Sequence, residues 1–237
     1  VEFPHRPMEK VGVFLHQLHR LQFFQNGFFR NLVFALPSLL FKMPGIRDVP
    51  NIPYLVAEMA QVTVNYIKSD GRAYDYLLVL DFDVDKISLS GVLNSFEQRD
   101  NWDVVSAYGY SISPRLQERI HDTYAMVLPG EENKPQQERP IKQLQRDICF
   151  NKDEDSLFPV YSAFGGLSIY KGGLLDGIQY GALNNHDPRV EVRCEHFSIC
   201  HQIHQKQATR IVINPRMHLR YETIWETFKR NIVRPNP

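Results

Sequence analysis

The chain has 237 residues, 43% of them hydrophobic, and its 27 acidic and 27 basic side chains give a formal net charge of zero. This is enough apolar material for one sizeable core, so we expect one globular domain. The balanced charge gives no support for nucleic acid as a partner, because nucleic-acid binding requires a clustered basic surface.

The first 45 residues are rich in phenylalanine and have the least regular pattern of the chain. Their apolar residues extend over positions 21–43, which is the length of a membrane span. Asn26 and Arg30 interrupt this stretch, and an amide or a charge is costly in hydrocarbon. We therefore expect residues 1–45 to pack on the core of the domain, and no membrane span within the chain.

The strongest signal is the segment YDYLLVLDFDVD at residues 74–85. A helical pattern at residues 54–69 precedes it. The unbroken apolar stretch before Asp81 suits a strand buried on both faces, as in a parallel sheet. Asp81, Asp83 and Asp85 follow at alternate positions. On a continued strand Asp81 and Asp83 would project to the same side, where two carboxylates can share a hard divalent cation.

The later segments alternate between the apolar spacing of a helix and that of a strand. We expect helices at residues 89–99 and 194–206, and strands at residues 102–108, 167–170 and 209–214, the last ending at Pro215. A strand, a helix and a second strand in this order form the unit of a parallel sheet with right-handed crossovers.

Two segments between these elements differ in composition. Residues 129–147 contain three prolines and many charges, which predicts an exposed, mobile loop. Residues 158–177 follow and include Gly165 and Gly166 between aromatic neighbours. Small residues are expected where the backbone approaches a ligand or another strand closely.

Four blocks in sequence order resemble a GT-A-type glycosyltransferase. They are the strand that ends in Asp81-Phe82-Asp83, WDVVSAYG at 102–109, AFGGLSIYK at 163–171 and CEH at 194–196. The similarity extends over residues 54–218 and fits family-2-like, capsule-associated and Golgi mannosyltransferase-like branches equally. It implies an α/β fold, with one Rossmann-related domain at 46–237 whose mostly parallel central sheet is flanked by helices.

The resemblance also implies a reaction. Such an enzyme moves a sugar from a nucleotide sugar, UDP- or GDP-linked, to a hydroxyl group of a glycan or another acceptor. Asp83 and Asp81 would hold the Mn²⁺ or Mg²⁺ ion that stabilises the diphosphate leaving group. Asp81, Gly165 and Gly166 would contact the donor.

The late helix would supply the base. By the resemblance, Glu195 at its start removes the proton of the acceptor hydroxyl, as in GT-A enzymes of the inverting type. The chain departs from many family-2-like enzymes here, because Glu195 is followed by His196 rather than by aspartate. His196 is therefore a candidate nitrogen ligand of the metal ion.

Three other interpretations remain open. His196, Cys200 and His204 are four residues apart and would share a helix face that suits zinc. A haloacid-dehalogenase-type phosphatase or phosphotransferase also places two aspartates, here Asp81 and Asp83, after a strand. A non-catalytic GT-A relative that binds a glycan or a partner is the third, since residues 57–61 lack the arginine of related mannosyltransferases. A eukaryotic source would favour the Golgi lumen, and a bacterial or viral source the cytoplasm.

Overall fold

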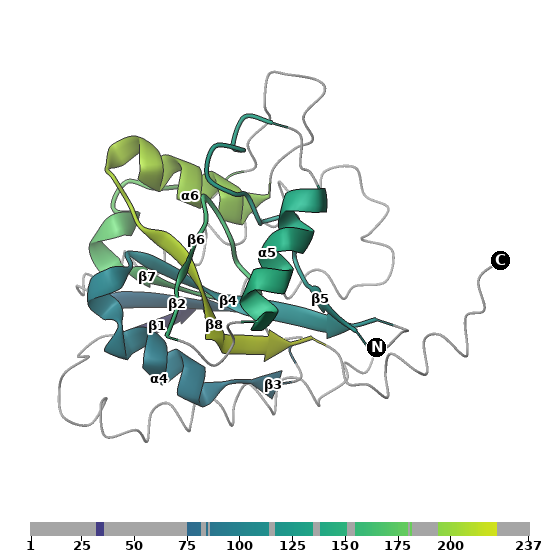
Figure 1. Ribbon diagram of the computed structural model, residues 1–237. Coiled ribbons are helices and arrows are strands. Elements are labelled where there is room, and N and C mark those ends of the chain that lie inside the picture. The colour runs from purple at the N-terminus through teal and green to yellow at the C-terminus, as the bar shows by residue number, and fades with distance from the viewer. Residues whose placement is uncertain are drawn as a thin grey trace, which may run out of the picture.

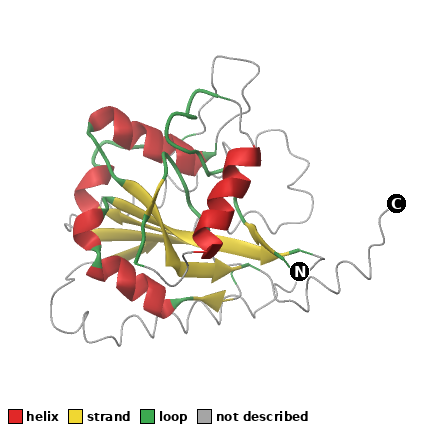
Figure 2. Ribbon diagram, in the orientation of Figure 1, coloured by secondary structure: helices red, strands yellow, loops and turns green. Residues whose placement is uncertain are grey.

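The computed structural model describes residues 32–35, 75–81, 84, 86–113, 117–134, 138–150, 155–179, 181 and 194–221. The expectations for residues 1–31, 36–45 and 54–69, and for Asp83 and Asp85, lie outside these residues. The described part of the chain forms a sheet with helices on both faces (Figures 1 and 2).

The sheet has eight strands. They are β1 (Leu32–Ala35), β2 (Tyr76–Leu80), β3 (Lys86–Ile87), β4 (Val104–Ile112), β5 (Glu118–Ile120), β6 (Phe158–Pro159), β7 (Leu167–Lys171) and β8 (Ile211–Arg220). Their order is β1-β2-β7-β4-β8-β3, with β5 paired to β4 and β6 paired to β8. The pairs β1–β2 and β4–β8 are parallel, and the other five pairs are antiparallel.

The predicted mostly parallel, Rossmann-like sheet is therefore wrong, because the sheet is mixed and mostly antiparallel. The prediction followed from the two-sided burial of the strand before Asp81, and that burial is present. Burial on both faces does not fix strand direction, however. Strand β7 lies between β2 and β4 and runs antiparallel to both, which the apolar pattern of a strand does not reveal.

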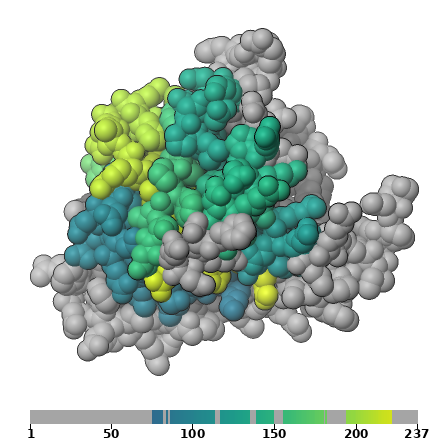
Figure 3. All heavy atoms as spheres, viewed as in Figure 1, coloured from purple at the N-terminus to yellow at the C-terminus, as the bar shows by residue number. Residues whose placement is uncertain are grey.

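Two cores lie on the two faces of the sheet. Alternate side chains of β2 pack in the two cores: Leu77 and Val79 belong to one, and Leu78 and Leu80 belong to the other. Helices α5 (Glu138–Phe150) and α6 (Glu195–Lys206) lie on the first face, and α4 (Leu89–Glu97) covers the second (Figure 1). Figure 3 shows atoms of α6, in yellow-green, beside teal and green atoms on that first face.

Two short 3₁₀ helices, η3 (Arg99–Asn101) and η4 (Gly172–Leu175), complete the described elements. The expected helices at 89–99 and 194–206 correspond to α4 and α6, and the expected strands at 102–108 and 167–170 correspond to β4 and β7. None of the helices in the described ranges is long and apolar enough to cross a membrane.

The second half of the loop expected at residues 129–147 is helical, because α5 begins at residue 138. Ile141, Leu144 and Ile148 follow one another at spacings of three and four, and they place one apolar stripe of α5 against the core. The charged residues Arg139, Lys142 and Arg146 lie on the solvent face of this helix. Gln145 fixes the helix to β5, since its amide donates a 2.6 Å hydrogen bond to the carbonyl oxygen of Glu118.

Strand β8 does not end at Pro215, as expected, but continues to Arg220. Its register against β4 shifts at this point, because Asn214 pairs with Ala107 whereas His218 pairs with Tyr108. Pro215 thus lies in a bulge, where the missing N–H interrupts no ladder hydrogen bond. The bulge lets β8 continue to Arg220, and the next residue, Tyr221, contacts Asp81 directly after β2.

Candidate functional site

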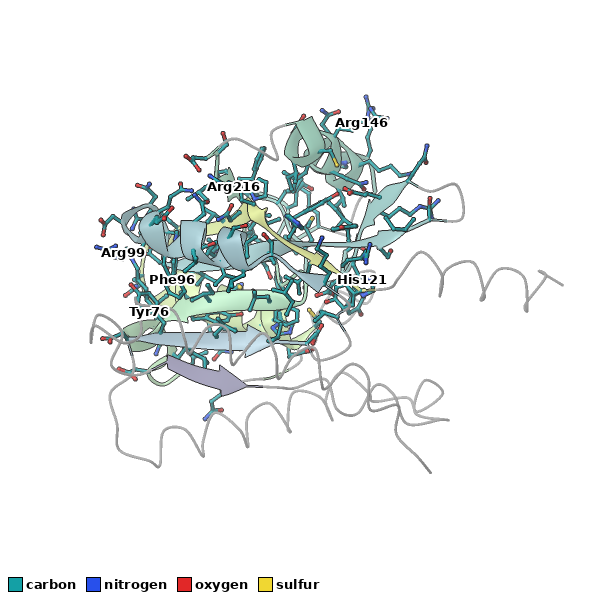
Figure 4. The ribbon with its side chains drawn as sticks, turned by 90° about the horizontal axis from the view of Figure 1, so that it is seen from below. Tyr76, Phe96, Arg99, His121, Arg146 and Arg216 are labelled. Atoms are coloured by element: carbon teal, nitrogen blue, oxygen red, sulfur yellow. The ribbon has the colours of Figure 1, made fainter. Side chains whose placement is uncertain are left out.

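Asp81 lies directly after β2, at the edge of the sheet where β2 and β8 end. Its backbone N–H donates a 2.8 Å hydrogen bond to the carbonyl oxygen of Gly166, so the position of the residue is fixed by the turn before β7. Figure 4 shows His121 at this end of the sheet, toward which the arrows of β1 and β2 point, and Tyr76 at the opposite end. The predicted location of Asp81 at the carboxyl end of a buried strand is confirmed.

Tyr221 binds the Asp81 side chain. Its hydroxyl donates a 2.8 Å hydrogen bond to Oδ2 of Asp81. The ring stacks on the imidazole of His121 with a centroid distance of 3.5 Å. Neither Tyr221 nor His121 was expected at the site, because neither belongs to an acidic or glycine-rich pattern in the sequence.

The two glycines of the predicted donor site have a packing role in the structure. Gly165 has a φ of +59° and approaches β4 so closely that a Cβ would overlap the carbonyl oxygen of Ala107. Gly166 has a φ of +86° and lies against the ring of Tyr221. The close approach that the sequence indicated is thus made to a strand and to a side chain of the protein itself. Donor binding by these glycines stays a prediction.

Glu195 begins α6 and is only 8% exposed. Burial raises the pKa of its carboxyl group above the ordinary value. A raised pKa makes the carboxylate a stronger base, which suits a group that takes a proton from an alcohol.

His196 is buried beside Glu195, and its ring stacks on Phe164 with a centroid distance of 3.6 Å. Its Nε2 lies 3.6 Å from Oε1 of Glu195, which is too far for a hydrogen bond. Burial lowers the pKa of His196 to about 3, so the imidazole is neutral at pH 7. Neutral imidazole is the form that binds metal ions, and the predicted ligand role of His196 stays a prediction.

Asp122 is a third carboxyl group at this site. Burial, and then the charges of Asp81 and Glu195, raise its pKa well above the ordinary value. Asp122 therefore links the end of β2 with the start of α6, which are more than a hundred residues apart in sequence. Its φ of 55° makes it the one non-glycine residue with a positive φ in the described ranges. Such backbone strain is often concentrated at functional sites.

Carboxylate oxygens are the ligand type that a hard cation prefers. The described side chains do not by themselves make up a complete set of ligands. Mg²⁺ and similar ions commonly use one or two protein carboxylates together with the phosphate oxygens of a substrate, and Asp81 is placed for such a role. Within the ranges that the structure describes, no group of three or more His, Cys, Asp or Glu side chains is arranged to hold a metal ion. Asp83, the principal predicted ligand, lies outside these ranges.

The alternative zinc site gains no support from the positions of its residues. Cys200 is buried, and burial raises the pKa of its thiol to about 11, so it carries no thiolate at pH 7. Nε2 of His204 lies 3.1 Å from the carbonyl oxygen of Tyr161. Together with the stacking of His196 on Phe164, these contacts place the three side chains in separate environments.

A cleft of about 540 Å³ lies at the other end of the sheet. Its lining includes Tyr161, His204, Thr209, Arg210 and Ile211. It begins where β8 begins, whereas the acidic side chains stand where β2 and β8 end. The cleft is therefore separate from the acidic site.

Comparison with known proteins identifies no family. No family model matches the chain, and no curated protein matches it. Among solved structures, the crystal structure of A197 from STIV is similar, with 14% sequence identity, 77% of this chain and 81% of that chain covered, and a TM-score of 0.41. A similarity of this size says nothing about a ligand or a reaction.

Proposed function

We propose that the protein is a metal-dependent glycosyltransferase that moves a sugar from a UDP- or GDP-linked donor to a hydroxyl acceptor. One observation supports the proposal most. In addition to burial, the charges of Asp81, at the strand end, and of Glu195, at the helix start, both raise the pKa of the half-buried Asp122, so two residues with complementary predicted roles lie near one another. The GT-A resemblance of the four sequence blocks supplies the assignment of those roles.

In this proposal Glu195 acts as the general base. Its carboxylate takes the proton of the acceptor hydroxyl while the oxygen attacks the anomeric carbon of the donor sugar. The bond from that carbon to the diphosphate breaks, and the nucleoside diphosphate leaves with the bonding electrons. The buried position of Glu195 limits the access of water, which would otherwise compete as acceptor.

Asp81 has a different part in the proposal. Bound Mn²⁺ or Mg²⁺ would supply a positive charge for the leaving diphosphate. Asp81, fixed by Tyr221 and by the carbonyl oxygen of Gly166, would orient that charge. The charges of Asp81 and Glu195 repel that of Asp122, and a cation or a shared proton relieves this repulsion.

Ligand-induced stabilisation tests the proposal. A UDP- or GDP-sugar with Mn²⁺, at a hundred times its dissociation constant, should raise the free energy of unfolding by about 2.7 kcal/mol. Asp81→Asn should abolish this rise. Asp75→Asn should retain it, because Asp75 is exposed at the opposite end of β2. Hydrolysis of a phosphate ester that requires Asp81, without any response to nucleotide sugars, would favour the dehalogenase-type alternative instead.

A further inference from the structure

Tyr221 is enclosed on three sides at the acidic site. Its hydroxyl donates to Oδ2 of Asp81 at 2.8 Å, and one face of its ring stacks on His121. Gly166 lies against the ring, where a Cβ would come within 2.8 Å of Cζ. Only 7% of Tyr221 is exposed, so this side chain has almost no freedom to turn away from Asp81.

Backbone hydrogen bonds fix every member of this arrangement to the sheet. The N–H of Tyr221 donates to the carbonyl oxygen of Tyr110 at 3.1 Å, and the N–H of His121 donates to that of Gly109 at 2.8 Å. The N–H of Asp81 donates to that of Gly166, also at 2.8 Å. The backbones of Tyr221 and His121 are therefore fixed to β4 and that of Asp81 to the turn before β7, so the hydroxyl and the carboxylate meet on side chains whose backbones are held in place.

We propose that Tyr221 is a positioning residue that fixes the Asp81 carboxylate for the metal and diphosphate part of the donor. This inference rests on the proposed function. A carboxylate that must bind a cation loses rotamer freedom on binding, and a partner that has already fixed it removes part of that cost. A hydrogen bond from a neutral hydroxyl fixes the carboxylate while leaving its negative charge in place, whereas a lysine or arginine would neutralise it.

Binding of Mn²⁺ alone, measured from the loss of the free Mn²⁺ signal in electron paramagnetic resonance, tests the inference on the full chain. Tyr221→Phe keeps the ring and its stacking but removes the hydroxyl. We expect its dissociation constant for Mn²⁺ to be about tenfold higher than that of the unmodified chain.

Tyr161→Phe is the matched control, because it also removes a hydrogen-bonded hydroxyl from a partly buried tyrosine. The Tyr161 hydroxyl lies 2.7 Å from Nδ1 of His201, beside the separate cleft. This variant should bind Mn²⁺ as the unmodified chain does. In a transfer assay, saturating Mn²⁺ should restore the turnover of Tyr221→Phe, since only the fixing of Asp81 is lost.

Three results would overturn the inference. They are unchanged Mn²⁺ affinity in Tyr221→Phe, an equal loss in both variants, and the absence of Mn²⁺ binding by the unmodified chain. The first two leave the proposed function standing, whereas the third would also contradict its metal dependence. Binding of Mn²⁺ needs neither donor nor acceptor, and a sugar transfer that proceeds without metal would uphold glycosyl transfer while excluding this role of Tyr221.

Discussion

Gly166 and Tyr221 fit together only because Gly166 has no side chain: a Cβ added there would lie 2.8 Å from Cζ of Tyr221. The φ of +86° at Gly166 is a second obstacle to any other residue. The contact joins the turn before β7 to the residue that follows β8. It therefore fixes the position of the Tyr221 ring, whose hydroxyl donates to Asp81.

Gly166→Ala should therefore displace Tyr221 and weaken Mn²⁺ binding in the same direction as Tyr221→Phe. It should also lower the free energy of unfolding by about 1–3 kcal/mol, because the added methyl group overfills the site. Gly173→Ala is the control, since a Cβ there meets nothing within 4 Å. Denaturant unfolding and Mn²⁺ titration check both effects. Equal behaviour of the two variants would contradict the close packing of Gly166 on Tyr221.

Asn214 anchors the bulged strand β8 to α4. Its Nδ2 donates to Oγ of Ser95 at 2.8 Å and to Oδ1 of Asn94 at 3.1 Å, and its Oδ1 accepts from the N–H of Arg216 at 3.0 Å. Asn214→Ala would remove these three hydrogen bonds and leave the N–H of Arg216 without this acceptor, so we expect a loss of about 1–3 kcal/mol in the free energy of unfolding.

Asn101→Ala is the control for Asn214→Ala, because Asn101 is exposed and should change the free energy of unfolding by no more than about 0.5 kcal/mol. Urea unfolding at neutral pH measures both variants. If Asn214→Ala were as stable as Asn101→Ala, the buried amide would not be what holds the bulge on α4.

The elements whose apolar residues recur with a clear period were predictable from the sequence. The apolar stretch before Asp81 formed β2, and helical spacing placed α4 and α6 within a few residues, including Glu195 at the start of α6. These predictions depend on local burial, which the alternation of side chains records directly.

The direction of strand pairing was not predictable in this way, and neither were the site residues that come from distant parts of the sequence. Strand direction depends on which distant segments become neighbours, and nothing in LSIYK at 167–171 indicates that β7 separates β2 from β4. Asp122 and Tyr221 lie near Asp81 only because the sheet brings distant segments together. Each is a single residue that belongs to no motif. The continuation of β8 beyond Pro215 was missed because a proline usually ends a strand, and the bulge that accommodates it leaves no clear pattern.

Asp103 provides a pH-dependent contribution to stability. Burial by itself would raise its pKa, but hydrogen bonds from Arg210 and Lys171 outweigh that effect and lower the pKa to about 2. A carboxyl group with a lowered pKa stabilises the folded state above its unfolded pKa of about 3.9, and this contribution is lost as the pH falls toward 2.

We therefore expect Asp103→Asn to be less stable than the unmodified chain at pH 7, with the difference shrinking between pH 4 and pH 2. Unfolding free energies of both proteins across this range are the measurement. Asn101→Ala, which changes no titratable group at an exposed position, is the comparison that should show no such trend. A constant difference down to pH 2 would mean that the ion pairs of Asp103 do not lower its pKa.

The role of Glu195 tests glycosyl transfer most directly, because it separates chemistry from binding. Mass spectrometry of acceptor glycans incubated with UDP- and GDP-sugars and Mn²⁺ should detect the added sugar. Glu195→Gln should reduce the rate of transfer by about 100-fold or more while retaining donor-induced stabilisation. Glu97→Gln, exposed at the end of α4, should transfer at the unmodified rate. No transfer from any such donor, or full transfer by Glu195→Gln, would contradict the proposal.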